Sequence, residues 1–139
     1  MVLILFAGLV HGAGHRTAEK IVSTKCHLCH GMEGEGSSAI YPRLAGQNKR
    51  YLVKQLTDFR SGARKGTMNE MAAGLTDDEI SALAEYFSSK PPAAHKVRDL
   101  EFAGVGRYIF NKGNRYSGVA ACASCHGENG EGNEQLPRL

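Results

Sequence analysis

The chain has 139 residues, 42% of them hydrophobic and 22% charged, with 17 glycines and no Trp. This length suits one ordinary domain or two very small ones. The scarcity of large aromatic side chains makes a large conventional core hard to build. We therefore expect a bound metal or cofactor to support the fold. The net charge of +3 fits docking against acidic protein surfaces and is far too weak for a nucleic-acid-binding protein.

The chain begins with an apolar run over residues 1–10, and Val10 and Gly12 are placed for cleavage after Gly12. The run has the length of the hydrophobic region of a signal peptide and is too short to span a bilayer. We therefore interpret residues 1–12 as a signal peptide that is cleaved on export, although the usual positive charge at its start is missing. The alternatives are a buried first helix and an uncleaved membrane anchor.

Apolar residues at helical spacing predict helices over residues 17–25 and 48–60. A glycine-rich loop over residues 31–46 is expected between them. A second loop is expected over residues 63–75. No segment alternates apolar and polar residues over a sustained length, so we expect no substantial sheet.

A further helix is predicted to begin at Thr76, because Thr76 and Glu79 have the spacing of a capping box. Its buried face would follow the apolar residues up to Phe87, and the prolines after Ser88 would end it. Beyond the linker, residues 101–111 predict one more helix, in which Gly104 and Gly106 would permit close approach of another helix.

The four cysteines fall in two close pairs, and each pair is followed at once by a histidine. These residues are Cys26, Cys29 and His30 in the first motif and Cys122, Cys125 and His126 in the second. Each motif continues into a glycine-rich stretch that ends in Pro-Arg-Leu, at residues 42–44 and 137–139. The two stretches align with one gap, which indicates a tandem duplication of one unit.

Cys-x-x-Cys-His is the attachment signal of c-type haem. Two thiols three positions apart on a helical turn can each form a thioether with one haem vinyl group, and the adjacent histidine then ligates the iron. A redox-active dithiol would sit near a βαβ pattern, which is absent. Zinc would require a compact set of four ligands, whereas the two cysteine pairs lie in separate repeats. The motifs therefore predict two covalently bound haem c groups.

A low-spin electron-transfer haem needs a second axial ligand, for which Met is the usual partner of His. Met68 and Met71 are far enough along the chain from His30 to reach the opposite face of the haem, whereas Met32 is too close. Spacing alone leaves both open, with one as the ligand and the other as packing. No Met follows Met71, so this sequence supplies no thioether ligand for the second iron.

The chain resembles the tandem dihaem class I cytochromes c of the c-four type. The resemblance rests on the first motif with its following glycine, on residues 42–47, on the helix over 51–59 and on residues 68–87. It covers nearly everything after the export segment. It implies an all-α fold of two tandem class I cytochrome c domains.

The resemblance also assigns roles to particular residues. It favours Met68 over Met71 as the axial ligand of the first iron. It implies that the carbonyl oxygens of Pro42 and Pro137 accept hydrogen bonds from the axial histidines, which would orient the rings and tune their basicity.

We expect the first cytochrome c domain over residues 13–90, a linker over 91–98 and the start of the second domain over 99–139. The first copy continues for about forty-five residues beyond Leu44 to complete its helices, whereas the second stops at its matching leucine. We therefore expect the second domain to be truncated.

The expected function is that of a bacterial periplasmic electron carrier rather than an enzyme, because neither iron needs to release a ligand. A cytochrome bc complex is a plausible donor and a terminal oxidase a plausible acceptor. The alternatives are a cytochrome subunit of a dehydrogenase complex and a dihaem peroxidase-like enzyme with one open iron. The expected partners are redox proteins, with no nucleic acid, and peripheral association with a membrane is left open.

Overall fold

The computed structural model describes residues 17–92, 97 and 99–139. The predicted signal peptide at residues 1–12 and most of the predicted linker lie outside these residues. The described part consists of helices and irregular segments with no strand, apart from an isolated antiparallel bridge between Asn114 and Val119. This confirms the all-α prediction. No helix within the described ranges has the length and apolar character needed to cross a bilayer.

The first helical segment is longer than predicted. Residues 17–21 are helical, η1 follows at Val22–Cys26 as a π-helix, and α2 continues over His27–His30. The N–H of His27 donates to the carbonyl of Val22, five residues earlier, which is the bond of a π-turn. The helix therefore runs through the whole first Cys-x-x-Cys-His motif instead of ending before it.

The helix α3 at Lys49–Ser61 confirms the prediction for residues 48–60. Asn48 caps it, since its side chain accepts hydrogen bonds from the N–H groups of Arg50 and Tyr51. The helix ends at Gly62, which has a left-handed conformation with φ of 78°.

The predicted loop over residues 63–75 is partly helical, because α4 spans Met68–Ala72. Thr67 precedes this helix without making a side-chain cap hydrogen bond. Instead, Asn69 holds the turn: its side-chain amide donates to the carbonyls of Phe59 and Arg64. Tertiary contacts of this kind leave no pattern in the local sequence, which explains why α4 was missed.

The helix α5 at Asp77–Ser88 begins as predicted. Both capping-box bonds are present: the Glu79 N–H lies 3.2 Å from the Thr76 hydroxyl oxygen, and the Thr76 N–H lies 2.9 Å from the Glu79 carboxylate. The side chains of this helix supply half of the buried core, and α5 packs against α3. The core consists of Ala18, Val22, Leu52, Ala72, Leu75, Ile80, Leu83, Ala84, Tyr86 and Phe87.

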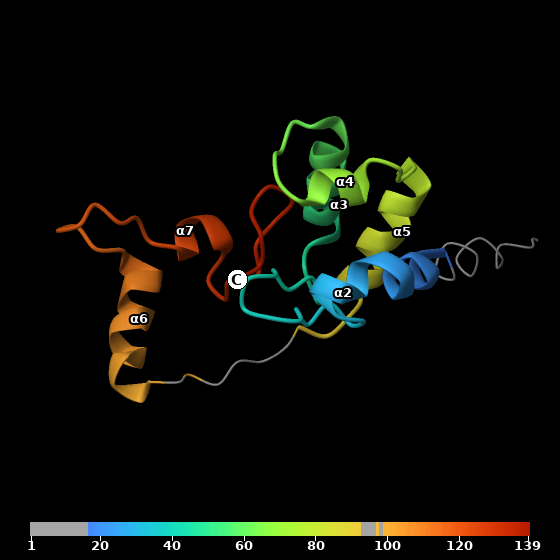
Figure 1. Ribbon diagram of the computed structural model, residues 1–139. Helices are drawn as coiled ribbons and strands as arrows, with labels where there is room; N and C mark the ends of the chain where they lie inside the picture. The colour runs from blue at the N-terminus through green and yellow to red at the C-terminus, as the bar shows by residue number, and fades with distance from the viewer. Residues whose placement is uncertain (1–16, 93–96, 98) are drawn as a thin grey trace, which may run out of the picture.

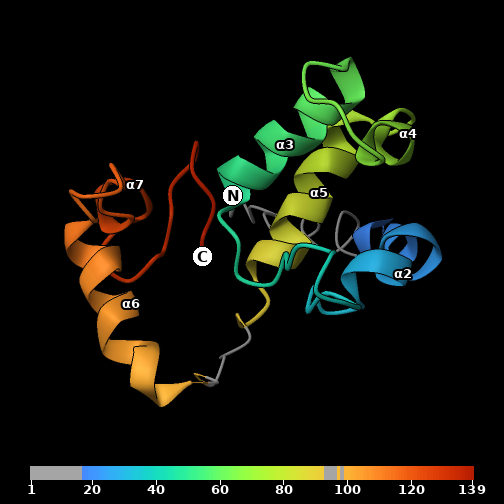
Figure 2. The same ribbon diagram turned by 60° about the vertical axis from the view of Figure 1, so that its left-hand side comes forward.

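We call residues 17–92 the first unit and residues 99–139 the second unit. In the second unit, α6 at Leu100–Lys112 confirms the predicted helix over 101–111, and α7 spans Ala123–His126. Figures 1 and 2 show α6 and α7 to one side of the helices of the first unit, with the C-terminal segment running back toward the start of α3.

None of the side chains of α6 is buried against the described residues. Phe102 is 63% exposed and Tyr108 is 65% exposed. A Cβ added at Gly104 or Gly106 would meet no described atom within 4 Å, so the close helix contact expected there is not made within the described part of the chain. The described apolar core therefore belongs to the first unit.

Candidate haem-attachment sites

The first motif lies where the N-terminal helix ends. Cys26 is the last residue of η1, Cys29 lies in α2, and both thiols are free. Burial raises the pKa of the Cys26 thiol, and the charge of Lys25 partly opposes this rise. Two unpaired thiols one helical turn apart are the chemistry that covalent attachment of haem requires.

His30 is buried, with 6% of its surface exposed, and its ring orientation is fixed. Its Nδ1 lies 2.9 Å from the carbonyl oxygen of Pro42. Because a carbonyl oxygen only accepts, Nδ1 must carry the proton, and Nε2 of the neutral ring keeps its lone pair. Within the described residues, Nε2 has no hydrogen-bond partner. This donor arrangement fits axial ligation of a haem iron, and the hydrogen bond expected at Pro42 is present.

The glycine-rich loop closes on itself to bring Pro42 to the histidine. Gly31 ends α2 with φ of 78° and ψ of 162°, a region that is essentially restricted to glycine. The N–H of Gly36 then donates to the His30 carbonyl across 2.7 Å, and the N–H of Leu44 donates to the Gly34 carbonyl across 2.8 Å. These backbone bonds fold the loop over residues 31–44 into one fixed shape.

The second motif reproduces this geometry. The Nδ1 of His126 lies 2.8 Å from the carbonyl oxygen of Pro137, and Gly127 has φ of 84° and ψ of 161°. The matching backbone bonds run from Gly132 to His126 across 2.7 Å and from Leu139 to Gly130 across 2.9 Å. The repeat that the sequence predicts is therefore also a repeat of structure.

An acidic side chain braces each loop in the same way. Glu35 accepts a hydrogen bond from the N–H of Glu33 across 2.9 Å, and Glu131 accepts one from the N–H of Asn129 across 2.9 Å. Hydrogen bonds from its own backbone N–H and from that of Asn129 lower the pKa of the Glu131 carboxyl.

The two sites differ in how far they are covered. His126 is only half-buried and Cys125 is exposed, whereas His30 is buried. The two methionines predicted as alternative ligands of the first iron also differ in exposure. Met68 is the first residue of α4 and is half-buried, while Met71 is 45% exposed. The assignment of Met68 as a ligand remains a prediction.

Tyr41 is a residue near the first site that sequence analysis missed. Its ring lies edge-on to the ring of His30, with 6.5 Å between centroids. A hydrogen bond with Cys29 raises the pKa of the Tyr41 phenol. Tyr41 lies in the irregular loop, where no periodicity marks which side chains turn toward the histidine.

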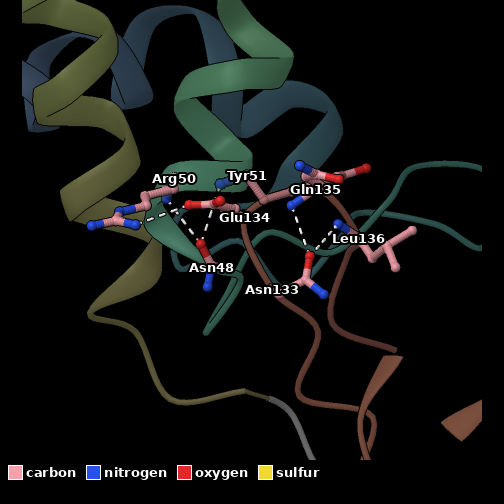
Figure 3. Close-up of polar contacts among 7 residues, drawn as sticks. All are labelled: Asn48, Arg50, Tyr51, Asn133, Glu134, Gln135 and Leu136. Atoms are coloured by element: carbon pink, nitrogen blue, oxygen red, sulfur yellow. Dashed lines mark hydrogen bonds and ion pairs between the residues drawn. The ribbon is translucent and has the colours of Figure 1, made fainter. Parts of the chain in front are cut away.

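Sequence analysis also missed the contact between the two units. The side chain of Gln47 hydrogen-bonds the backbone of Arg138, 91 residues later. Beside it, Arg50 pairs with Glu134 at 2.9 Å, while Asn48 and Asn133 each hold two backbone N–H groups of their own segment (Figure 3). A contact over such a separation has no signal in a single sequence.

In the described ranges, no group of three or more His, Cys, Asp and Glu side chains could hold a metal ion. The strands of a βαβ redox fold are also missing from these ranges.

Comparison with known proteins identifies the family of this chain. Residues 16–90 match the family described as Cytochrome c. The chain belongs to the cytochrome c family. Members of this family bind haem c covalently, so this chain is a haem c protein.

Two similar proteins place the chain within the cytochrome c4 type, and a third carries another name. It is 34% identical over 144 residues to cytochrome c4 of Azotobacter vinelandii, covering 95% of this chain and 68% of that protein. The structure of reduced recombinant cytochrome c4 from Pseudomonas stutzeri superimposes with a TM-score of 0.78 at 34% identity, covering 90% of this chain and 71% of that one. A thiosulfate dehydrogenase electron acceptor of Stutzerimonas stutzeri is 40% identical over 111 residues, covering 77% of this chain. The chain spans about two thirds of the length of the first two proteins and 51% of the third.

Proposed function

We propose that the chain is a periplasmic dihaem c-type cytochrome that passes single electrons between partner proteins and catalyses no reaction of its own. The observation that carries this proposal is the duplicated histidine geometry. In both units Nδ1 of the motif histidine donates to a proline carbonyl, at 2.9 Å for His30 and 2.8 Å for His126. A protein with one haem would need this arrangement at one histidine, whereas two haems need it at both.

Different residues of each motif would hold the haem in different ways. The thiols of each motif would form the thioether bonds, the motif histidines would ligate the iron, and Met68 would complete the first site with Met71 as the alternative. The thiols are those of Cys26 and Cys29 in the first unit and Cys122 and Cys125 in the second.

Haem c supplies a reversible one-electron change at its iron. The protein contributes fixed ligands, because a proline carbonyl holds each imidazole ring in one tautomer and one orientation. Covalent attachment suits a periplasmic location, since the cofactor cannot diffuse away. The predicted export segment at residues 1–12 supports that location.

The favoured partners are a respiratory donor such as a cytochrome bc complex and an acceptor such as a terminal oxidase. A second candidate is the cytochrome partner of a dehydrogenase complex. It is supported by the 40% identity to a protein named as a thiosulfate dehydrogenase electron acceptor. Both candidates use the same haem sites and differ in the protein that docks.

The test of the haem sites begins with the full chain, expressed in a host equipped for cytochrome maturation. Pyridine haemochrome assay should give two haems per chain, and peptide mass spectrometry should find both motif segments modified. Replacing both cysteines of one motif by Ala should remove one haem and leave the other. Free thiols at Cys122 and Cys125 in the coloured wild-type protein would overturn the dihaem proposal.

The test of the partner compares two oxidation–reduction assays on the same preparation. Rapid oxidation of the reduced protein by a terminal oxidase would support the respiratory assignment. Rapid reduction by a thiosulfate dehydrogenase in the presence of thiosulfate, with slow oxidation by the oxidase, would replace it with the dehydrogenase assignment.

A further inference from the structure

Gln47 is a buried polar side chain at the contact between the two units. It is 7% exposed, and His30 is the other buried polar or charged side chain in the described ranges. Its Oε1 accepts hydrogen bonds from the N–H of Arg138 at 2.7 Å and from the N–H of Asn48 at 3.0 Å. Its Nε2 donates to the carbonyl of Arg138 at 3.3 Å. The carboxamide is therefore held in one orientation by three backbone groups.

The same peptide group links Gln47 to the second motif histidine. The N–H of Arg138 and the carbonyl of Pro137 belong to one peptide bond. Its N–H donates to Gln47, while its carbonyl oxygen accepts from Nδ1 of His126 at 2.8 Å. The bonds form a continuous chain from a side chain of the first unit to the histidine of the second.

Hydrogen bonds on opposite ends of one peptide strengthen each other. When the N–H donates to a good acceptor, electron density shifts toward the carbonyl oxygen, which becomes a stronger acceptor. A stronger acceptor at Nδ1 makes the imidazole a better electron donor through Nε2. A better donor favours the oxidised iron and so lowers the reduction potential of its haem.

We propose that Gln47 is a positioning residue of the first unit that lowers the reduction potential of the haem bound by His126. It acts through the Pro137–Arg138 peptide and not by touching the haem. The inference rests on the proposed dihaem function, because it assumes that His126 ligates an iron.

The first unit provides an internal comparison. There the Nδ1 of His30 donates to the carbonyl of Pro42 at 2.9 Å, so the corresponding peptide joins Pro42 to Arg43. Within the described part of the chain, the N–H of Arg43 has no hydrogen-bond acceptor. The influence of Gln47 should therefore fall on one of the two haems.

The test uses the full haem-loaded chain and the variant Gln47→Met, which keeps the length of the side chain without its amide. In the reduced state, the proton NMR signals of the Arg138 amide and of His126 Nδ1–H should both move upfield. The midpoint potential of the second haem should rise. The Nδ1–H signal of His30 and the first potential should stay as in the wild type. Gln47→Glu places a carboxylate, a stronger acceptor than the amide, opposite the N–H of Arg138, so the His126 Nδ1–H signal should not move upfield in this variant.

A matched control separates polarisation of the peptide from loosening of the contact. The double variant Arg50→Gln/Glu134→Gln removes the ion pair between the units at unchanged net charge. Neither of these two side chains bonds to the Pro137–Arg138 peptide. The double variant should leave the His126 signal and both potentials unchanged. If it reproduces the effects of Gln47→Met, the proposal is wrong and the contact acts only as a mechanical support.

Two further outcomes would also overturn the proposal. In Gln47→Met, the His126 Nδ1–H signal and the second potential could stay at their wild-type values, or both potentials could move together. Failure of the dihaem function is recognised separately, because the wild-type protein would then carry one haem and free thiols at Cys122 and Cys125.

Discussion

The phenol of Tyr86 donates a hydrogen bond to the main-chain carbonyl of Met32 across 3.1 Å, although the two residues are 54 positions apart. Tyr86 lies in α5 and is 3% exposed, whereas Met32 lies near the start of the loop that follows the first motif. Lys90 reinforces this contact: its ammonium lies 4.3 Å from the centre of the Tyr86 ring and 2.8 Å from the Glu33 carboxylate. The end of α5 therefore fastens the loop that carries Pro42.

Removing the hydroxyl of Tyr86 should loosen the loop without disturbing the core. We expect Tyr86→Phe to lower the free energy of unfolding by about 0.5–1.5 kcal/mol, the usual net worth of one hydrogen bond. Chemical denaturation of the haem-loaded protein measures this change. Tyr108→Phe is the matched control, because Tyr108 is 65% exposed and should change little. Equal effects of the two substitutions would show that the bond to Met32 contributes nothing.

The capping box of α5 should be a measurable source of stability. Thr76→Ala removes the acceptor of the Glu79 N–H and should lower the free energy of unfolding by about 1 kcal/mol. Thr76→Ser keeps a hydroxyl acceptor and should retain most of the stabilisation. Thr67→Ala serves as the comparison, since Thr67 precedes α4 without making a side-chain cap bond. Thermal unfolding of the three variants distinguishes the loss of a cap hydrogen bond from a general effect of replacing a threonine by Ala.

Gly31 should tolerate no side chain. A Cβ there would lie 2.2 Å from the carboxyl carbon of Glu35, and the backbone conformation is one that other residues avoid. Even if Glu35 swings away, the backbone strain should cost about 1–3 kcal/mol in Gly31→Ala. Gly74→Ala should be neutral or slightly stabilising, because Gly74 has no positive φ and open space around it. Denaturant titration of both variants tests the contrast.

The Glu131 carboxyl should make stability depend on pH in a defined direction. Its pKa is lowered in the folded chain from the ordinary value of 4.5 by hydrogen bonds from backbone N–H groups. The stabilisation is therefore fully present above pH 4.5 and is lost as the pH falls through the lower folded pKa. The difference in unfolding free energy between the wild type and Glu131→Gln should be constant at neutral pH and shrink in acid. A carbon NMR titration midpoint at or above 4.5 would contradict this explanation.

Met68 and Met71 give a direct test of the sixth ligand. Met68→Leu should remove the thioether from the first iron and lower that haem's reduction potential, since Met raises the potential relative to other partners of His. Met71→Leu, at a position 45% exposed, should leave the potential and the spin state unchanged. The reverse pattern would assign the ligand to Met71.

The features that could be predicted from sequence are those fixed by short-range rules. The capping box at Thr76 and Glu79 depends on two residues three positions apart, and both predicted bonds are present. The helix α3 likewise follows from its own apolar spacing and from the Asn48 cap. The hydrogen bond from His30 to Pro42 could be anticipated only because a family resemblance named it.

The features that escaped prediction depend on partners distant in the chain. The helix α4 is held by Asn69, whose side chain reaches carbonyls five and ten residues away. The π-turn at Val22 lies inside a helix whose sequence gives no reason for widening. The contact of Gln47 with Arg138 spans 91 residues and requires both units to be in place.

The backbone bonds that close the loop after each motif lie within its own stretch of chain, although side chains from elsewhere in the chain also brace both loops. In the second unit the contacts of Gly132 with His126, of Leu139 with Gly130 and of His126 with Pro137 are all of this kind, and they form without any buried side chain in α6. Such a segment is portable. A gene duplication could copy it, or a protein engineer could graft it, and the histidine would arrive already oriented before any surrounding core had evolved to shelter it.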